Sequence, residues 1–287
     1  MKKKILALCL VVVLVATAIT GVTLAYFTDT TQKQTNTFTM GDIEIKLDET
    51  DIDAEEEGAR TEEDQKYGVL MPGISYVKDP IITVKAKSED CYVFLEIDLN
   101  KYVSLINLMG VDAYHNKIGG LEGDYNTVGF VNFVTKLLSD SKLRETVLDR
   151  WFVGVDHADW RIMNLEELKN AVAGAPSQTN PDYLNIKLGY IGELATDNVI
   201  KKSDSDTKLE FMTNFAMPNT VTEEMFDGDL AYKLPNDKGE MVSKSNFNTE
   251  SADFKISFTA HAIQANDTSN GINSLETAYA EYFAQNK

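Results

Sequence analysis

Histidine is the natural starting point for metal chemistry, because zinc peptidases usually carry two histidines four residues apart with an adjacent glutamate base. The sequence contains three histidines, His115, His157 and His261, and no two of them are four residues apart. His261 falls in a segment of alternating polar and apolar residues, where we expect an ordinary surface or core histidine. The sequence therefore offers no HExxH zinc motif.

The densest group of possible metal ligands is Asp156, His157 and Asp159, which lies between Trp151 and Trp160. Carboxylate and imidazole groups together can bind Zn²⁺, and the tryptophans would shield such a site. The alternative is a solvated loop after a helix, with both tryptophans packed into the core. We favour this alternative, expect no metal site, and keep the three residues as candidates.

Two short acidic segments could attract Ca²⁺, which prefers clustered oxygen ligands. Residues 51–55 superficially resemble a calcium loop, but Glu56 stands where that loop requires glycine. Residues 204–206 form a similar but shorter group. We expect solvated acidic loops at both places and no cofactor, with zinc or calcium only as alternatives.

Nucleophilic chemistry has little support in the sequence. Cys91 has no motif that places a histidine beside it, and the residues after it read as a packed strand. We therefore expect a buried, inert thiol. The motifs GxSxG, Walker A and GxGxxG are absent, so the hydrolase, nucleotide and dinucleotide classes lack support.

The charge balance excludes other classes of function. The 287 residues include 27 basic and 45 acidic side chains, with a formal net charge of −18. Such a chain is a poor partner for nucleic acid or for an anionic membrane surface. The apolar fraction of 43% is enough to build a packed core, so the chain is not expected to be disordered.

Residues 1–25 have the layout of a secretory signal peptide. Three lysines precede an apolar run over residues 5–19, and Thr23 and Ala25 supply small side chains at the −3 and −1 positions of a cleavage site. Cleavage after Ala25 removes 25 of the 287 residues and three lysines, which leaves 262 residues and a formal charge of −21. A permanent anchor is the alternative, but a spanning helix needs about 20 apolar residues. We expect export and no membrane span after cleavage.

The remaining pattern predicts a mainly β protein. Alternation or β-branched composition indicates strands, and the sequence between 88 and 90 suggests a hairpin turn. Helical spacing appears over residues 131–151, with a break at 139–141. Asn164 and Glu167 resemble a capping box for a helix to about residue 172, and residues 273–276 begin a short C-terminal helix. The expected strands cover residues 26–39, 42–47, 81–86, 91–99, 183–191, 209–217 and 253–264.

Three segments together resemble the TasA–camelysin family of exported bacterial proteins. The first runs from the leader junction LAYFTD at residues 24–29 into NTFTMGDI at residues 36–43. The second combines MPG at 71–73, KDP at 78–80 and SEDCYV at 88–93, and the third is TAHAIQA at 259–265. The resemblance covers roughly 80 residues at the two ends of the chain and leaves the middle unmatched.

The resemblance implies a jelly-roll-like antiparallel β-sandwich with helical inserts, secreted to the cell surface or biofilm matrix. It also implies fibres in which the N-terminal strand of one subunit completes the sheet of the next, so copies of the chain or related matrix proteins are the expected partners, besides the signal peptidase. The domains expected are the leader 1–25, an assembly strand 26–40, and a sandwich 41–287 with a partly helical insert at about 107–206. The assembly residues are Tyr26, Phe27, Thr28, Thr35 and Phe38.

Elementary physics fits strand donation, because a detached strand exposes amides and carbonyls that a second chain can pair. The alternatives are that residues 26–39 form an ordinary first strand or a floppy terminus, that the chain is a camelysin-type surface metalloendopeptidase, or that the unmatched middle makes it an adhesin. An assembly protein without catalysis is the reading that we favour.

Overall fold

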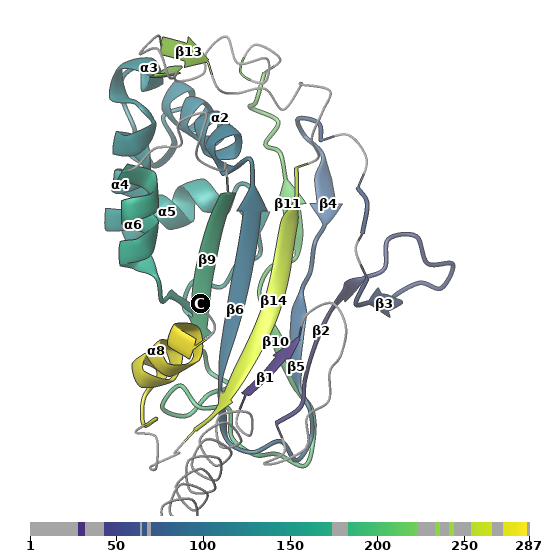
Figure 1. Ribbon diagram of the computed structural model, residues 1–287. Helices are drawn as coiled ribbons and strands as arrows, with labels where there is room; N and C mark the ends of the chain where they lie inside the picture. Colours follow the sequence, from purple (N-terminus) through teal and green to yellow (C-terminus); the bar gives the residue numbers. More distant parts are fainter. Residues whose placement is uncertain are drawn as a thin grey trace, which may run out of the picture.

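The computed structural model describes residues 28–31, 43–63, 65–67, 70–173, 183–222, 225, 233–235, 241–243, 254–265 and 272–285. Two antiparallel sheets form its centre (Figure 1). The five-stranded sheet has the order β1 (Thr28–Thr31), β14 (Ile256–Gln264), β6 (Cys91–Asn100), β9 (Tyr183–Tyr190), β8 (Trp160–Ile162). The four-stranded sheet has the order β10 (Thr207–Glu210), β5 (Ile81–Val84), β2 (Ile45–Thr50), β3 (Arg60–Thr61).

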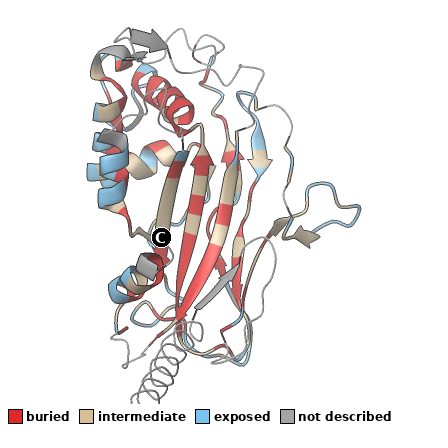
Figure 2. Cartoon of the chain, viewed as in Figure 1, coloured by how far each residue is buried: buried red, intermediate tan, exposed pale blue. Residues whose placement is uncertain are grey.

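The main core lies between these two sheets. Alternate residues of β6 and β14 point inward and meet the buried side chains of β2, β5 and β10 in one hydrophobic cluster. Val93, Leu95, Ala260 and Ala262 are fully buried on the five-stranded side. Figure 2 shows the corresponding red bands on β6 and β14. The mainly β, antiparallel prediction is thus confirmed, while the jelly-roll detail stays a prediction.

A helical layer lies beside one end of the five-stranded sheet (Figure 1). Its helices are α2 (Tyr102–His115), α3 (Tyr125–Val128), α4 (Phe130–Ser139), α5 (Ser141–Leu148) and α6 (Leu165–Ala173), with a 3₁₀ turn at Ile118–Gly120. The C-terminal helix α8 (Leu275–Gln285) covers the other end of the same sheet. Two small sheets complete the fold. One has the order β4 (Ser75–Val77), β11 (Asn214–Ala216), β7 (Phe152–Val153), and the other pairs β12 (Lys233–Pro235) with β13 (Met241–Ser243).

Several sequence predictions are confirmed by this arrangement. The helical stretch breaks at Asp140, whose side chain accepts a hydrogen bond from the Leu143 amide and so caps α5. The strand β6 alternates as expected, with Phe94, Glu96 and Asp98 on the face away from the main core. The short C-terminal helix begins at Leu275, where the Ser274 hydroxyl accepts a bond from the Thr277 amide.

Other predictions are wrong. β5 and β6 belong to different sheets, so the segment at 88–90 crosses the sandwich and is no hairpin turn. Residues 209–217 divide between β10 and β11 in different sheets. The side chain of Asn164 does not cap α6, because its amide group bonds the backbone of β9 at Asn185 and Lys187. The sequence predicts no separate helix at α2, although residues 107–115 fall within the expected, partly helical insert.

None of the helices in the described part of the chain combines the length and apolarity that crossing a membrane requires.

Candidate functional site: the edge strand β1 and its neighbours

The predicted assembly segment supplies the edge strand of the five-stranded sheet. β1 pairs antiparallel with β14, in a register that sets Thr28 opposite Ile263 and Thr31 opposite Ala260. Thr28 is the predicted assembly residue that this strand contains. Tyr26, Phe27, Thr35 and Phe38, like the cleavage residues Thr23 and Ala25, lie outside the described residues.

β1 covers only part of its neighbour. β14 pairs with β6 along residues 256–264, but with β1 only at residues 260–263. In the ladders of the described residues, positions 256–259 therefore have a strand on one side alone. β1 also lies against β2 of the opposite sheet, as Figure 1 shows. This edge is thus where β1 brings the two sheets together.

A buried lysine connects the two sheets at the part of β14 that β1 does not cover. Lys78 is 9% exposed, and its ammonium lies 5.2 Å from the ring centre of Phe258 on β14. The same nitrogen lies 2.7 Å from a carboxylate oxygen of Glu49 on β2. The pairing satisfies the buried charge. Lys78 therefore joins the edge of one sheet to the other through one cation–π contact and one ion pair.

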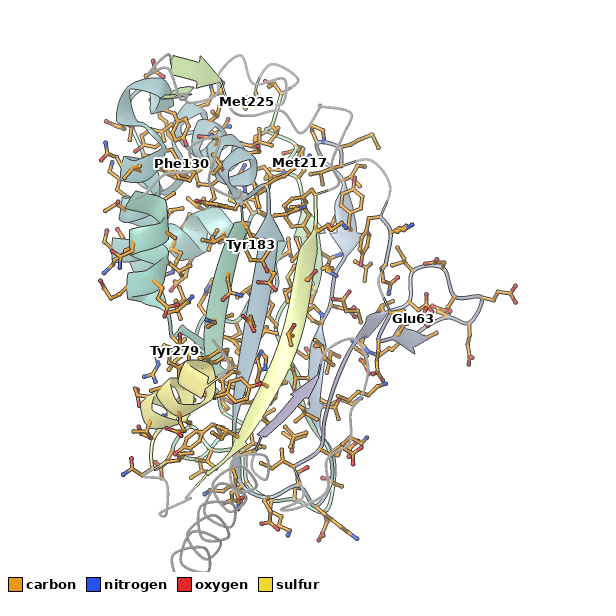
Figure 3. The ribbon with its side chains drawn as sticks, viewed as in Figure 1. Glu63, Phe130, Tyr183, Met217, Met225 and Tyr279 are labelled. Carbon is orange, nitrogen blue, oxygen red and sulfur yellow. The ribbon has the colours of Figure 1, made fainter. Side chains whose placement is uncertain are left out.

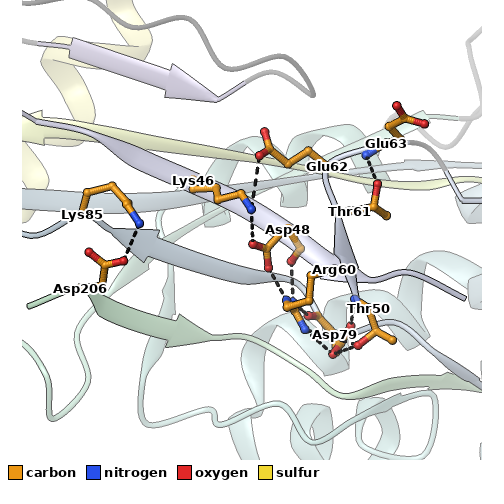
Figure 4. Close-up of polar contacts among 10 residues, drawn as sticks. All are labelled: Lys46, Asp48, Thr50, Arg60, Thr61, Glu62, Glu63, Asp79, Lys85 and Asp206. Atoms are coloured by element: carbon orange, nitrogen blue, oxygen red, sulfur yellow. Dashed lines mark hydrogen bonds and ion pairs between the residues drawn. The ribbon is translucent and has the colours of Figure 1, made fainter. Parts of the chain in front are cut away.

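A polar network fixes the start of the hairpin between β2 and β3 (Figure 4). The Arg60 guanidinium pairs with Asp48, and it also donates to Asp79 at 2.9 Å. Asp79 in turn accepts from the amide and the hydroxyl of Thr50, both at 2.7 Å. Burial raises the pKa of Asp48, but hydrogen bonds from Arg60 and Lys46 outweigh that effect and hold its pKa below the ordinary value. The network thereby holds β2, which lies between β5 and β3, in place beside β1.

The opposite face of β14 carries a buried histidine. His261 is 4% exposed and lies opposite Thr30 in the register of β1. Its Nε2 is 2.9 Å from a carboxylate oxygen of Glu96, and its Nδ1 is 2.9 Å from the Tyr282 hydroxyl of α8. The prediction of an ordinary histidine left both possibilities open, and the structure places it in the core.

The candidate metal residues do not converge. His157 Nε2 lies 2.6 Å from Asp149, whereas Asp159 lies near the Tyr190 hydroxyl, at 3.4 Å. Burial and the charge of Asp156 raise the pKa of Asp159. A shallow surface hollow is lined by Glu145, Asp156 and His157. Within the described ranges, no three His, Cys, Asp or Glu side chains are arranged to hold a metal ion, and this includes the segment 51–55.

Both tryptophans and the cysteine are buried, as the sequence predicts. Trp151 is 0% and Trp160 6% exposed. Cys91 is 0% exposed, and burial raises the pKa of its thiol to about 12. Because the thiolate is the reactive form, this cysteine is inert near neutral pH.

Comparison with known proteins bears on the N-terminal part of the chain. Residues 1–56 match the model of the camelysin metallo-endopeptidase family. This confirms the resemblance to the TasA–camelysin family. The matched range includes the predicted leader, β1 and β2. Comparison with curated proteins and with solved structures gave no significant match.

Proposed function

We propose that this chain is an exported cell-surface or matrix protein that self-assembles by exchange of β1. In this proposal β1 of one copy pairs with β14 of the next copy, in the register that it has with β14 of its own chain. The observation that carries the proposal is the placement of β1 at the sheet edge, with four register pairs to β14. The family match supports a secreted surface protein of the camelysin type.

Exchange of β1 between copies costs little free energy. A net backbone hydrogen bond is worth about 1 kcal/mol, so the ladder bonds of a four-residue strand contribute only a few kcal/mol. The same bonds reform in the neighbouring copy. Head-to-tail exchange does not close on itself, so it gives filaments rather than rings.

The chain length between β1 and β2 permits the exchange. Residues 32–44 separate the two strands, which is 13 residues. An extended chain spans about 3.3–3.6 Å per residue, so the segment can reach roughly 40 Å. This distance is about four times the spacing of roughly 10 Å between two packed sheets. The connection therefore allows β1 to reach a neighbouring copy without any change to β2.

The test compares three samples by sedimentation velocity. They are chain 26–287, chain 40–287, and chain 40–287 mixed with a peptide of residues 26–39. We expect large elongated species from the first sample only, and one-to-one peptide binding in the third. The deleted segment contains one aspartate and one lysine, so its removal leaves the net charge unchanged.

Two outcomes would contradict the proposal. Either chain 40–287 forms the same elongated species as chain 26–287, or chain 26–287 stays monomeric across salt and pH. High salt belongs in the series because the acidic copies repel one another, and added ions screen that repulsion.

A second candidate function follows from the name of the matching family, which is that of a metallo-endopeptidase. If the chain is such an enzyme, we expect stoichiometric zinc and chelator-sensitive cleavage of an unfolded substrate such as casein. His157→Ala should then abolish cleavage while leaving assembly intact, because His157 precedes β8, which is at the opposite edge of the five-stranded sheet from β1. Purified protein without bound metal and without cleavage would remove this candidate.

A further inference from the structure

The C-terminal helix α8 is attached through a hydrophobic cluster of its own. This second cluster lies on the outer face of the five-stranded sheet and is separate from the core between the sheets. Phe94 contacts Tyr279 and Phe283 at ring distances of 6.1 and 5.9 Å. Figure 3 shows Tyr279 on α8 beside the sheet. A small satellite cluster of this kind opens at lower cost than the main core.

The polar anchor of α8 is the pair formed by His261 and Glu96. The Tyr282 hydroxyl of α8 bonds one ring nitrogen of His261, and Glu96 bonds the other, each at 2.9 Å. The His261 ring also packs against Phe283, at 5.4 Å between centres. His261 therefore connects α8 to two central strands at once, β14 and β6.

Charged and titratable groups of several elements lie around this anchor. Asn185 of β9 donates to Glu96 and to Asp98, both at 2.6 Å, and Tyr183 bonds Asp98 farther along the sheet. Lys187 of β9 lies over the Phe283 ring at 4.7 Å and 3.9 Å from Glu167 of α6. α8 contributes Tyr279 and Tyr282. Asp29 of β1 holds the register position opposite Ala262.

We propose that α8 is a clamp on β14 that opens when Glu96 loses its charge, and that its opening loosens the hold of β14 on β1. The second half of this inference rests on the proposed function, because it gives β1 release a regulator. The first half stands on the geometry of α8 alone.

The direction of the effect follows from the hydrogen bonds. With Glu96 ionised, both neutral and protonated His261 keep a partner on each ring nitrogen. Once Glu96 is protonated, the buried His261 ring loses its charge-assisted hydrogen bond to the Glu96 carboxylate, which weakens the anchor. The His261 hydrogen bond lowers the pKa of Glu96 and outweighs burial, and Asn185 adds to this effect. The contribution to stability is therefore complete above the ordinary glutamate pKa and is lost as the pH falls through the lowered value.

Hydrogen exchange of the mature monomer tests the clamp at constant pH. We expect Glu96→Gln at pH 7 to raise the exchange rate of residues 275–285 at least tenfold, and that of residues 26–31 as well. Glu122→Gln is the matched control, because it makes the same charge change at an exposed side chain. The wild-type chain should show the same loosening only below about pH 4.5, the ordinary range for a glutamate.

A double variant distinguishes loss of the Glu96 charge from general misfolding. Glu96→Leu with His261→Phe replaces the anchor by apolar groups of similar shape, and we expect its α8 to stay protected at pH 4. Unchanged α8 exchange in Glu96→Gln would overturn the clamp. Faster exchange of α8 with unchanged exchange of residues 26–31 would overturn the coupling to β1. Both readouts come from monomers, so failure of fibre formation is a separate result that concerns the proposed function.

Discussion

A chain with Asp29→Cys and Ala262→Cys should lose the ability to assemble when it is oxidised as a monomer. The two positions are opposite each other in the register of β1 and β14. Directly opposite residues of antiparallel strands have Cβ atoms about 4.5–5.5 Å apart, close enough for a disulfide after a small adjustment. The bridge would tie β1 to its own chain, so no copy could donate it. We expect elongated species to fall to the level of chain 40–287 in sedimentation velocity.

The same variant reports which chain β1 occupies in the polymer. If it assembles under reducing conditions and is then oxidised, the bridge should link different copies. Denaturing gels would then show a ladder of covalent multimers. Cys91 does not interfere, because it is fully buried with a thiol pKa raised to about 12.

The matched control for this experiment moves the second cysteine by two residues along β14, so that it stays on the same face of the strand. Asp29→Cys with Ala260→Cys sets the pair diagonally, about 7–8 Å apart, which is too far for an unstrained bridge. This control should assemble under oxidising and reducing conditions alike. If an oxidised, bridged Asp29 and Ala262 variant still assembled, strand exchange would be the wrong mechanism.

The local parts of the fold are accessible from the sequence because they depend on near neighbours. The alternation of Phe94, Glu96 and Asp98 against Leu95, Ile97 and Leu99 assigns the two faces of β6 without any knowledge of its partners. The break between α4 and α5 is readable because Asp140 is a capping residue. Such signals act within a few residues.

The helix α2 lacks a readable signal for a physical reason. Twelve of its 14 residues are buried, so it has no polar face to give the spacing of an amphipathic helix. It also contains two β-branched valines and a glycine, which weaken its helix propensity. Tertiary burial decides its conformation, and a short apolar run does not distinguish a buried helix from a strand.

The candidate site depends on contacts between residues far apart in the sequence, which the sequence patterns do not predict. Thr28 meets Ile263 across 235 positions of the chain, and His261 meets Glu96 across 165. No sequence feature near Thr28 or His261 identifies the residue with which it pairs. The alternation around His261 suggests that it points to one face of a strand, but not that Glu96 and Tyr282 bond it there. The sequence thus indicated a strand able to pair, and the structure supplied β14 as its partner.

The largest effect on stability is expected from Arg150→Ala in the helical layer. Asp112 of α2 is 1% exposed, and its carboxylate accepts hydrogen bonds from Arg150 at 3.0 Å and Asn116 at 2.9 Å, with Thr220 as a third donor. Removal of one partner of a buried ion pair leaves an uncompensated charge and costs about 3–5 kcal/mol. Arg150 is 27% exposed, so water enters part of the gap. We therefore expect a loss of about 3 kcal/mol in the free energy of unfolding, at the low end of that range.

Urea unfolding of three variants distinguishes this cause from the loss of any arginine. Arg161→Ala removes an exposed pair with Glu276 and should cost less than about 1 kcal/mol. Asp112→Asn in the Arg150→Ala background removes the stranded charge and should restore most of the loss, because a neutral amide is far cheaper to bury. Equal losses for Arg150→Ala and Arg161→Ala would show that Asp112 is not the reason. Asp112, Arg150 and Thr220 come from three separate segments, so this network ties the helical layer to the loop after β11.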